Sequence, residues 1–280
     1  MRARMASQRV LMLGLVAVYC SLVGFAPLLD RLVLFPTTAP ISAGTAARKA
    51  IAFEGGEVEV WTAASQSSRS GQPTTYVLRF YGNADRAERW VAEEAEMFRG
   101  RAIEVWGVNY PGFGGSTPPA RLVRIGPAAL AAYDEMKRTA GERPIVIFGA
   151  SLGTVAALHI AANRSVTGVI LHNPLPLRQM ILRQFGWWNL WLLAGPLAQK
   201  IPAALDSIAN AKASRAPAIF LLAENDEVVA PRFQSLVVKA YAGAKREVLL
   251  RGSYHNSPLE DEGLKDFHAA LEWLMPADAK

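Results

Sequence analysis

The chain has 280 residues, of which 51% are hydrophobic and 19% charged, so a disordered or fibrous protein is excluded and a large core is expected. Its single cysteine excludes a disulfide framework and a cysteine-based metal site. A net charge of +6 would suit a nucleic-acid partner. Residues 1–35 hold four arginines and one aspartate, whereas the remaining residues hold 26 basic and 23 acidic groups. Because that remainder is nearly neutral and shows no basic cluster interleaved with aromatics, nucleic-acid binding is not expected.

Residues 1–35 predict a membrane anchor. Three arginines within residues 1–9 precede an uncharged, apolar stretch over residues 10–29, which Asp30 ends. Twenty helical residues span about 30 Å, the thickness of a bilayer core. The basic flank places the N-terminus in the cytoplasm and the rest of the chain on the extracytoplasmic side, periplasmic or lumenal.

A cleaved signal peptide and a buried core helix are the alternatives to an anchor. No clear small-residue cleavage site follows the apolar stretch, and a core helix would not need the arginine-rich flank. A lipid at Cys20 is not favoured, because the bulky Tyr19 precedes it. We therefore expect an anchor in residues 1–35 and a folded domain in residues 36–280, which would be secreted if the leader is cleaved.

Behind the leader, residues 36–50 predict a tether and residues 65–73 a polar loop. Strand-like and helix-like segments alternate from Thr75 onward, which indicates βαβ units and a mostly parallel sheet with helices on both faces. The expected strands cover residues 75–81, 102–110, 144–149, 167–173, 216–223 and 246–250. The expected helices cover residues 85–100, with a capping box formed by Asp85 and Glu88, and residues 127–139, 152–163 and 259–274.

Residues 175–213 interrupt this alternation, since they show helical runs and no strand pattern, and so predict an inserted helical cap. The segment holds Phe185 and three of the seven tryptophans, Trp187, Trp188 and Trp191. These aromatics fit a lid that lines an apolar acyl pocket or dips into a membrane interface, and they fit equally a cap packed on the sheet.

Residues 149–153 have the form G-x-S-x-G, between an expected strand and an expected helix. That setting is typical of a nucleophile elbow, in which flanking glycines admit a tight turn and the turn lifts the serine hydroxyl above the sheet. The helix N-terminus beneath it favours developing negative charge. We therefore predict Ser151 as a nucleophile, the alternative being a turn that only caps a helix.

A serine nucleophile needs a histidine base and an acid that orients it. His255, in the loop after the last strand, is the best-placed base, and His172, at the end of a strand, is its rival. His159 lies too far along its helix to reach Ser151, and His268 is expected on a helix surface.

The acid is expected from the loop at residues 223–229, which follows a strand. Asp226 has the best spacing there, and Glu224 and Glu227 are interpreted as solvated loop charges. The order Ser151, Asp226, His255 is that of α/β hydrolases.

An oxyanion needs backbone donors as well. The N–H of Leu152, next to the nucleophile, and the N–H of Asn83, in the loop after the first predicted parallel strand, are the candidates. Gly82 would let that loop approach the site closely, although an ordinary strand-to-helix turn would also explain the glycine.

Several of these motifs together resemble the α/β-hydrolase superfamily, and within it the membrane-anchored, Bem46-like serine hydrolases. The resemblance covers about residues 30–275 and depends on LVLFPTT, YGNAD, NYPGFGGS, GASLG, AENDEVVAP and SYHN. It implies a sheet of about eight mostly parallel strands, a triad of Ser151, Asp226 and His255, and an oxyanion hole from the amides of Asn83 and Leu152. The family usually has His-Gly-Asn where this chain has Tyr81-Gly82-Asn83, which leaves the triad intact but changes the loop's support.

The expected activity is hydrolysis of ester or related acyl bonds, of the carboxylesterase or lipase type, through an acyl-enzyme and without metal or organic cofactor. The expected partners are a small-molecule or lipid acyl substrate and the membrane that holds the leader. Acyl transfer or peptide cleavage by the same triad, and a silent membrane-tethered interaction module, are the alternatives. NYPGFGGS, at residues 109–116, is interpreted as a structural loop, since no P-loop lysine follows.

Overall fold

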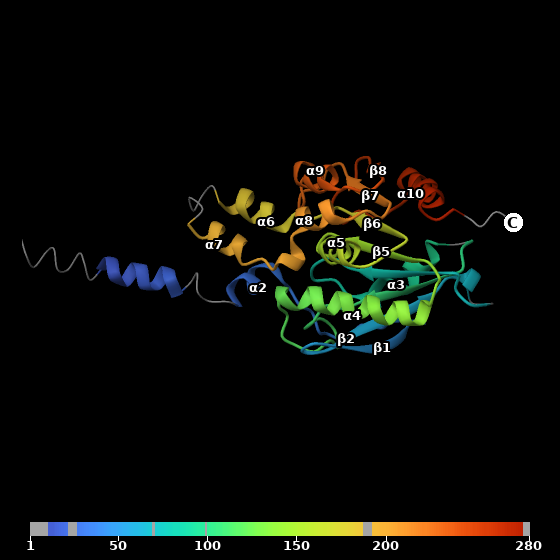
Figure 1. Ribbon diagram of the computed structural model, residues 1–280, viewed down its shortest axis with the longest axis horizontal. Coiled ribbons are helices and arrows are strands. Elements are labelled where there is room, and N and C mark those ends of the chain that lie inside the picture. The colour runs from blue at the N-terminus through green and yellow to red at the C-terminus, as the bar shows by residue number, and fades with distance from the viewer. Residues whose placement is uncertain (1–10, 22–26, 69–70, 99, 187–191, 277–280) are drawn as a thin grey trace, which may run out of the picture.

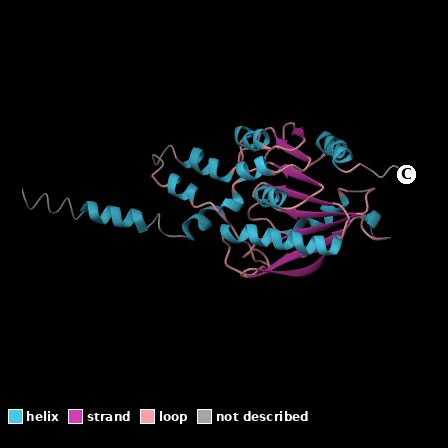
Figure 2. Cartoon of the chain, in the orientation of Figure 1, coloured by secondary structure: helices cyan, strands magenta, loops and turns pink. Residues whose placement is uncertain are grey.

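The computed structural model describes residues 11–21, 27–68, 71–98, 100–186 and 192–276 (Figure 1). Within these residues the chain forms an eight-stranded sheet of order β1-β2-β4-β3-β5-β6-β7-β8 with helices on both faces (Figure 2). Pairing from β4 through β8 is parallel, whereas β1–β2 and β2–β4 are antiparallel. The predicted α/β-hydrolase architecture is confirmed. The strands are β1 Ala47–Phe53, β2 Gly56–Ala64, β3 Thr75–Phe80, β4 Ile103–Val108, β5 Ile145–Ala150, β6 Gly168–His172, β7 Ala218–Ala223 and β8 Lys245–Leu250.

All six strands predicted from the sequence are present, but the hairpin β1–β2 was missed. The predicted tether over residues 36–50 is wrong at its end, because β1 begins at Ala47. In this outer strand Ile51 is the only fully buried side chain, so no apolar run marks it in the sequence. β2 alternates acidic and apolar residues before Trp61 and joins β1 to the parallel strands.

The helices follow the predicted alternation with additions. They are α2 Pro27–Val33, α3 Ala87–Glu96, α4 Leu122–Ala140, α5 Gly153–Asn163, α6 Leu177–Met180, α7 Ala194–Gln199, α8 Ser207–Ala213, α9 Pro231–Ala240 and α10 Asp261–Leu274, with a π-helical turn at Ile181–Phe185 and short 3-10 turns at Gln66–Ser68 and Ala203–Leu205. The helices between β6 and β7 occupy the predicted cap insertion. Trp187, Trp188 and Trp191 of that insertion lie outside the described residues, and the side chain of Phe185 does too, so both interpretations of these aromatics stay open.

The first amides of two helices are capped by side chains that are distant in sequence. The predicted capping box of α3 is wrong. Arg86 is the N-cap residue, and its side chain makes no capping hydrogen bond to the helix. The Ala87 N–H is instead accepted by Asn109 Oδ1 at 2.9 Å. Similarly, Asp30 Oδ1 accepts the N–H of Leu122 at 2.8 Å, so α4 begins five residues before the predicted start and contains Pro127. Each cap satisfies an amide that the helix itself leaves unpaired.

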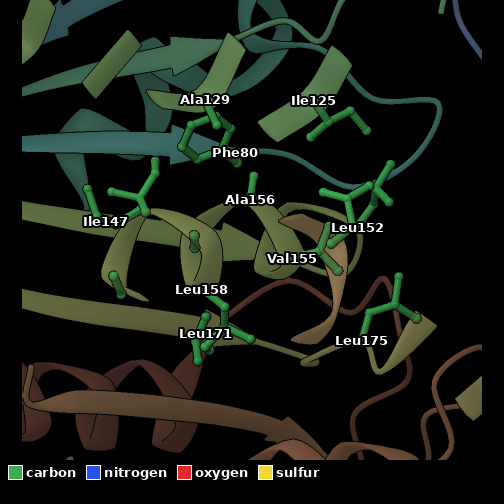
Figure 3. Packing of buried hydrophobic residues seen from close by; sticks show 14 of the residues in the cluster. Phe80, Ile125, Ala129, Ile147, Leu152, Val155, Ala156, Leu158, Leu171 and Leu175 are labelled. Atoms are coloured by element: carbon green, nitrogen blue, oxygen red, sulfur yellow. The ribbon is translucent and has the colours of Figure 1, made fainter. Parts of the chain in front are cut away.

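The sheet divides the core into two clusters. Val146 of β5 joins the cluster under α3 and α10, and its neighbour Ile147 joins the one under α4, α5, α8 and α9. This alternation follows from the two-residue period of a strand buried on both faces. Figure 3 shows the second cluster around α5, with Phe80, Ile147 and Leu171 from the strands and Val155, Ala156 and Leu158 from the helix.

The predicted leader lies only partly within the described residues. Residues 11–21 form an exposed helix, residues 1–10 and 22–26 lie outside the described residues, and α2 follows (Figure 1). Among the described residues, no helix combines the length and the hydropathy that a bilayer crossing requires. Leu29 and Leu34 are each only 4% exposed and belong to the main core cluster. Two residues assigned to the leader therefore pack against the core of the domain.

Replacing Leu29 with alanine tests this packing. We expect Leu29→Ala to lower the free energy of unfolding by about 2–4 kcal/mol, since it deletes buried methyl groups. Leu32→Ala is the matched control in the same helix, because Leu32 is 57% exposed, and it should cost less than about 0.5 kcal/mol. Denaturant unfolding of both variants measures the difference. Equal stability of the two would show that α2 is not part of the folded unit.

Candidate active site

Ser151 lies on a strained turn between β5 and α5. Its φ is +50°, a region that residues with a Cβ rarely adopt. A Cβ on Gly149 would lie 2.5 Å from the carbonyl oxygen of Gly153, and one on Gly153 would overlap the carbonyl of Phe80. Only glycine fits at both flanks, and this steric limit explains the two glycines of the predicted G-x-S-x-G turn. The Ser151 N–H is held by the carbonyl of His172, 2.8 Å away.

The structure brings the three predicted triad residues together. His255 Nε2 lies 3.0 Å from Ser151 Oγ, and His255 Nδ1 lies 2.8 Å from Asp226 Oδ2. Because an ionised carboxylate only accepts hydrogen bonds, Nδ1 carries the proton and Nε2 is free to accept from the serine hydroxyl. The three residues come from loops at the carboxyl ends of β5, β7 and β8, the edge where sites of open α/β sheets lie.

The Asp226 carboxylate is buried and held by further hydrogen bonds. Oδ1 accepts the N–H groups of Val228 and Val229 at 2.9 and 2.6 Å, and Oδ2 accepts Nε2 of Gln234 at 2.9 Å. These donors fix the carboxylate that faces the imidazole. Gln234 lies on α9 and was not predicted, since a single glutamine in an amphipathic helix carries no sequence signal.

The acid loop and the histidine loop are bonded to each other. Glu227 Oε2 accepts the N–H of His255 at 3.2 Å, and Glu224 Oε2 accepts the N–H of Gly252 at 2.9 Å. The N–H of Asn225 donates to the Ser253 carbonyl at 2.9 Å. The two glutamates are exposed, as predicted, but they also join the loops that carry Asp226 and His255.

The rival base His172 faces the site as a neutral ring. Loss of solvent lowers its pKa to about 4, the charges of Arg79 and His255 act in the same direction, and Asp226 opposes them. The ring therefore takes up its second proton, and becomes positively charged, only in acid. Burial also lowers the pKa of His159, which pairs with Asn163 on α5, and His268 Nε2 lies 3.0 Å from the Met97 carbonyl.

The loop after β3 passes beside the nucleophile. A Cβ on Gly82 would lie 3.7 Å from Ser151 Cβ, so this loop and the N-terminus of α5 flank the hydroxyl. The side chain of Asn83 fixes the loop, since Oδ1 accepts the N–H of Phe35 at 2.9 Å and Nδ2 donates to the carbonyl of Val33. Leu152 precedes the first turn of α5, where amides lack helical partners. The roles of the Asn83 and Leu152 amides remain predictions.

Tyr81 supports this loop by a buried network. Its hydroxyl donates to Glu94 Oε2 at 2.8 Å, and Arg79 binds both oxygens of Glu94. The Arg79 guanidinium also lies 4.6 Å from the centre of the Tyr81 ring. Burial and the charge of Glu94 raise the pKa of Tyr81 well above its ordinary value, so the phenol stays protonated and keeps donating.

The NYPGFGGS loop is a structural element here. Asn109 Nδ2 donates to Glu59 and to Glu88, each at 2.8 Å. Burial would raise the pKa of Glu59, but hydrogen bonds from Gly115, Arg48 and Asn109 outweigh it and the pKa lies below its ordinary value. The loop glycines are needed because a Cβ on Gly115 would lie 2.6 Å from Glu59 Oε1. In the part of the chain that the structure describes, no group of three or more metal-ligating side chains gathers.

Comparison with known proteins agrees with this geometry. An uncharacterized protein of Mycobacterium tuberculosis is 29% identical over 240 residues, 81% of this chain and 80% of its own. The esterase Est1E of Butyrivibrio proteoclasticus superposes with a TM-score of 0.63 and 15% identity, over 81% of this chain and 97% of its own. A bacterial membrane phospholipase A superposes with a TM-score of 0.58 and 16% identity, over 98% of this chain and 100% of its own.

The family evidence is more direct for one part of the chain. Residues 82–211, which run from the loop after β3 through the Ser151 turn into the cap insertion, match the model of the Alpha/beta hydrolase family. The chain therefore has the α/β-hydrolase fold, and residues 82–211 resemble the Alpha/beta hydrolase family.

Proposed function

We propose that the protein is a serine hydrolase that cleaves ester or related acyl bonds through an acyl-enzyme. One observation carries the proposal: an unbroken hydrogen-bonded chain runs from Ser151 Oγ through His255 to the buried Asp226. Esterases among the structural neighbours support hydrolysis as the reaction class.

In the first half-reaction, His255 Nε2 takes the proton of Ser151 as the oxygen attacks the acyl carbonyl carbon. The carbonyl oxygen gains negative charge, which the amides of Leu152 and Asn83 would receive. His255, now charged, is stabilised by Asp226, and it passes its proton to the leaving alcohol as the acyl–oxygen bond breaks. Ser151 is left as an ester of the acyl group.

In the second half-reaction, His255 activates a water molecule, which attacks the acyl-enzyme at the same face. The carboxylic acid leaves and Ser151 regains its proton from the imidazole. The hydrogen bonds that hold Asp226 matter in both halves, since the carboxylate must keep one imidazole tautomer throughout. Hydrolysis of p-nitrophenyl esters of graded chain length would define the acyl group.

We further propose that the protein belongs to the Bem46-like branch and acts on the extracytoplasmic side of a membrane. The uncharged apolar stretch behind the N-terminal arginines supports an anchor. A neighbour described as a membrane phospholipase A, which matches nearly the whole chain, supports a lipid or other acyl substrate at a membrane.

Labelling of Ser151 tests the nucleophile. We expect a fluorophosphonate probe to react with the wild-type protein at one site, and Ser151→Ala to abolish both labelling and esterase activity, by at least about 10³-fold. Mass spectrometry of the labelled peptide locates the site. Thr154→Ser, on the same helix, is the control that should still label. A folded wild-type protein that resists the probe would contradict the proposal.

The pH dependence distinguishes the two histidines. Because the pKa of His172 lies at about 4, that ring is already neutral throughout the range in which an ordinary histidine titrates. We therefore expect His172→Gln to leave the acid limb of kcat/KM where it is in the wild type. A wild-type limb centred near pH 4 that disappears in His172→Gln would instead assign the base to His172.

A further inference from the structure

Exposed apolar side chains gather at the edge of the molecule that holds the active site. Leu32 lies on α2 and Phe35 just after it, and the bond between Asp30 and Leu122 places α2 against the start of α4, where Val123 is exposed. On the insertion, Leu192 is 61% exposed. We call Leu32, Phe35, Val123 and Leu192 the docking face.

The docking face continues to the rim of the triad. The N–H of Phe35 is bonded to Asn83 in the loop beside Ser151. On the other side, the exposed Val228 lies two positions after Asp226, and the exposed Tyr254 directly precedes His255. Monomeric proteins rarely leave such apolar groups together on one side unless that side meets a partner.

Basic residues outnumber acidic ones around the docking face, where Asp206 pairs with Arg178 at 3.1 Å and Asp30 lies beside Arg31. Residues 174–205 carry Arg178, Arg183 and Lys200 and no acidic residue. Arg31 precedes Leu32, and Arg121 lies two positions before Val123. An apolar surface with a basic border matches the boundary between acyl chains and anionic headgroups.

The leader meets the chain on this same side. Residues 11–21 form a helix that is exposed along its whole length, and Leu11, Met12, Leu13, Leu15, Val16 and Val18 are among its exposed apolar side chains. Tyr19 of this helix donates a hydrogen bond to the carbonyl of Leu192, 2.8 Å away. A helix that is apolar on all sides needs an apolar solvent, and one occupant, a lipid bilayer, would cover both it and the docking face.

We propose that the docking face binds the surface of an anionic bilayer, so that the domain lies on the membrane with its triad edge toward the lipid. This contact is separate from any anchoring by the leader, since it is made by the domain's own side chains. A second copy of the chain or a protein partner on this face would give a different result in the test below.

The test uses the full chain with Cys20→Ser and a nitroxide attached at Leu192→Cys or Phe35→Cys, bound to phosphatidylglycerol-containing vesicles. We expect electron paramagnetic resonance to show that both labels are accessible to oxygen and protected from a water-soluble nickel chelate. The matched control is Leu249→Cys, because Leu249 is 48% exposed on the outer strand β8 and should stay in water.

Labels at 192 and 35 as accessible to the chelate as the label at 249 would overturn the proposal. Dipolar coupling between labels of two molecules, present without vesicles, would also overturn it in favour of a second copy. Arg183→Glu should weaken protection at 192 on anionic vesicles. The measurement requires no turnover, so its outcome is independent of whether Ser151 is a nucleophile.

A second inference concerns Asn173, which follows β6. It is 2% exposed and adopts a φ of +50°, and its N–H donates to the Leu221 carbonyl at 2.9 Å. Asparagine tolerates this left-handed region better than most residues. The buried amide is therefore held in a defined place at the carboxyl edge of the sheet.

The side chain of Asn173 bonds to both loops that complete the triad. Oδ1 accepts the N–H of Ala223, three residues before Asp226, at 3.0 Å. Nδ2 donates to the main-chain carbonyl of His255 at 3.1 Å. The neighbouring His172 carbonyl holds the N–H of Ser151. Two consecutive residues at the end of β6 thus contact the chain at or near all three triad members.

We infer that Asn173 is a positioning residue that sets His255 against Ser151 and Asp226; this inference rests on the proposed function. Asn173→Asp is the sharpest variant. Aspartate tolerates the same backbone and still accepts from Ala223, but it replaces the donor to His255 by an oxygen that repels its carbonyl.

We expect Asn173→Asp to lower kcat by up to about 10²-fold and to leave KM nearly unchanged, since small misplacements of catalytic groups have effects of this size. The low-field proton resonance of the His255–Asp226 hydrogen bond should shift or broaden. Asn163→Asp, the same change at an exposed residue of α5, is the matched control and should alter neither.

Asn173→Gly keeps the left-handed backbone and removes both bonds, so it should also lower kcat if the variant folds. Wild-type kcat and an unchanged proton resonance in Asn173→Asp would overturn the inference. If the wild-type protein itself does not react with a fluorophosphonate, the proposed function fails first, and the two failures are distinguishable.

Discussion

The left-handed backbone of Ser151 is the constraint on which the rest of the site depends. A residue with a Cβ stays at a φ of +50° only where its surroundings hold it. Here the carbonyl of His172 on β6 accepts its N–H, and the flanking glycines let α5 and the end of β3 close in from both sides. The same parallel sheet brings the ends of β7 and β8 to this edge, so the order of strands determines which loops can reach the hydroxyl.

The strands buried on both faces and the proximity of Ser151, Asp226 and His255 could be predicted, because both leave strong local patterns. Continuous apolar runs mark β5, β6 and β7, and the G-x-S-x-G turn gives the order in which acid and base must follow. The hairpin β1–β2 has no such run, since its outer strand is mostly exposed. Asn173 and Gln234 could not be predicted, because one buried amide has no periodicity and its importance arises from contacts across 82 and 8 residues of sequence, respectively.

The predicted starts of α3 and α4 were wrong for a related physical reason. A capping box is a local pattern, but α3 and α4 are capped by Asn109 and Asp30, which are 22 and 92 residues from the amides they accept. Asp30 had been taken as the end of an apolar leader. Its side chain instead ties α2 to α4, so an interval with a single hydropathy signal contains an exposed helix and a packed one.

Buried charged groups near the site are paired with groups of opposite charge, and Asp226 differs from them. Burying an ion is costly unless it is paired and hydrogen-bonded. Arg79 is matched by Glu94 with Tyr81 as a further donor, and Glu59 is bonded to Arg48 and Asn109. Among the described residues, the donors to Asp226 are neutral in the resting state: two backbone amides, Gln234 and the His255 ring. In the proposed mechanism, the cation that it meets is the imidazolium of His255, which forms when the serine proton is transferred. The carboxylate is thereby arranged to favour the charged intermediate state over the resting neutral ring.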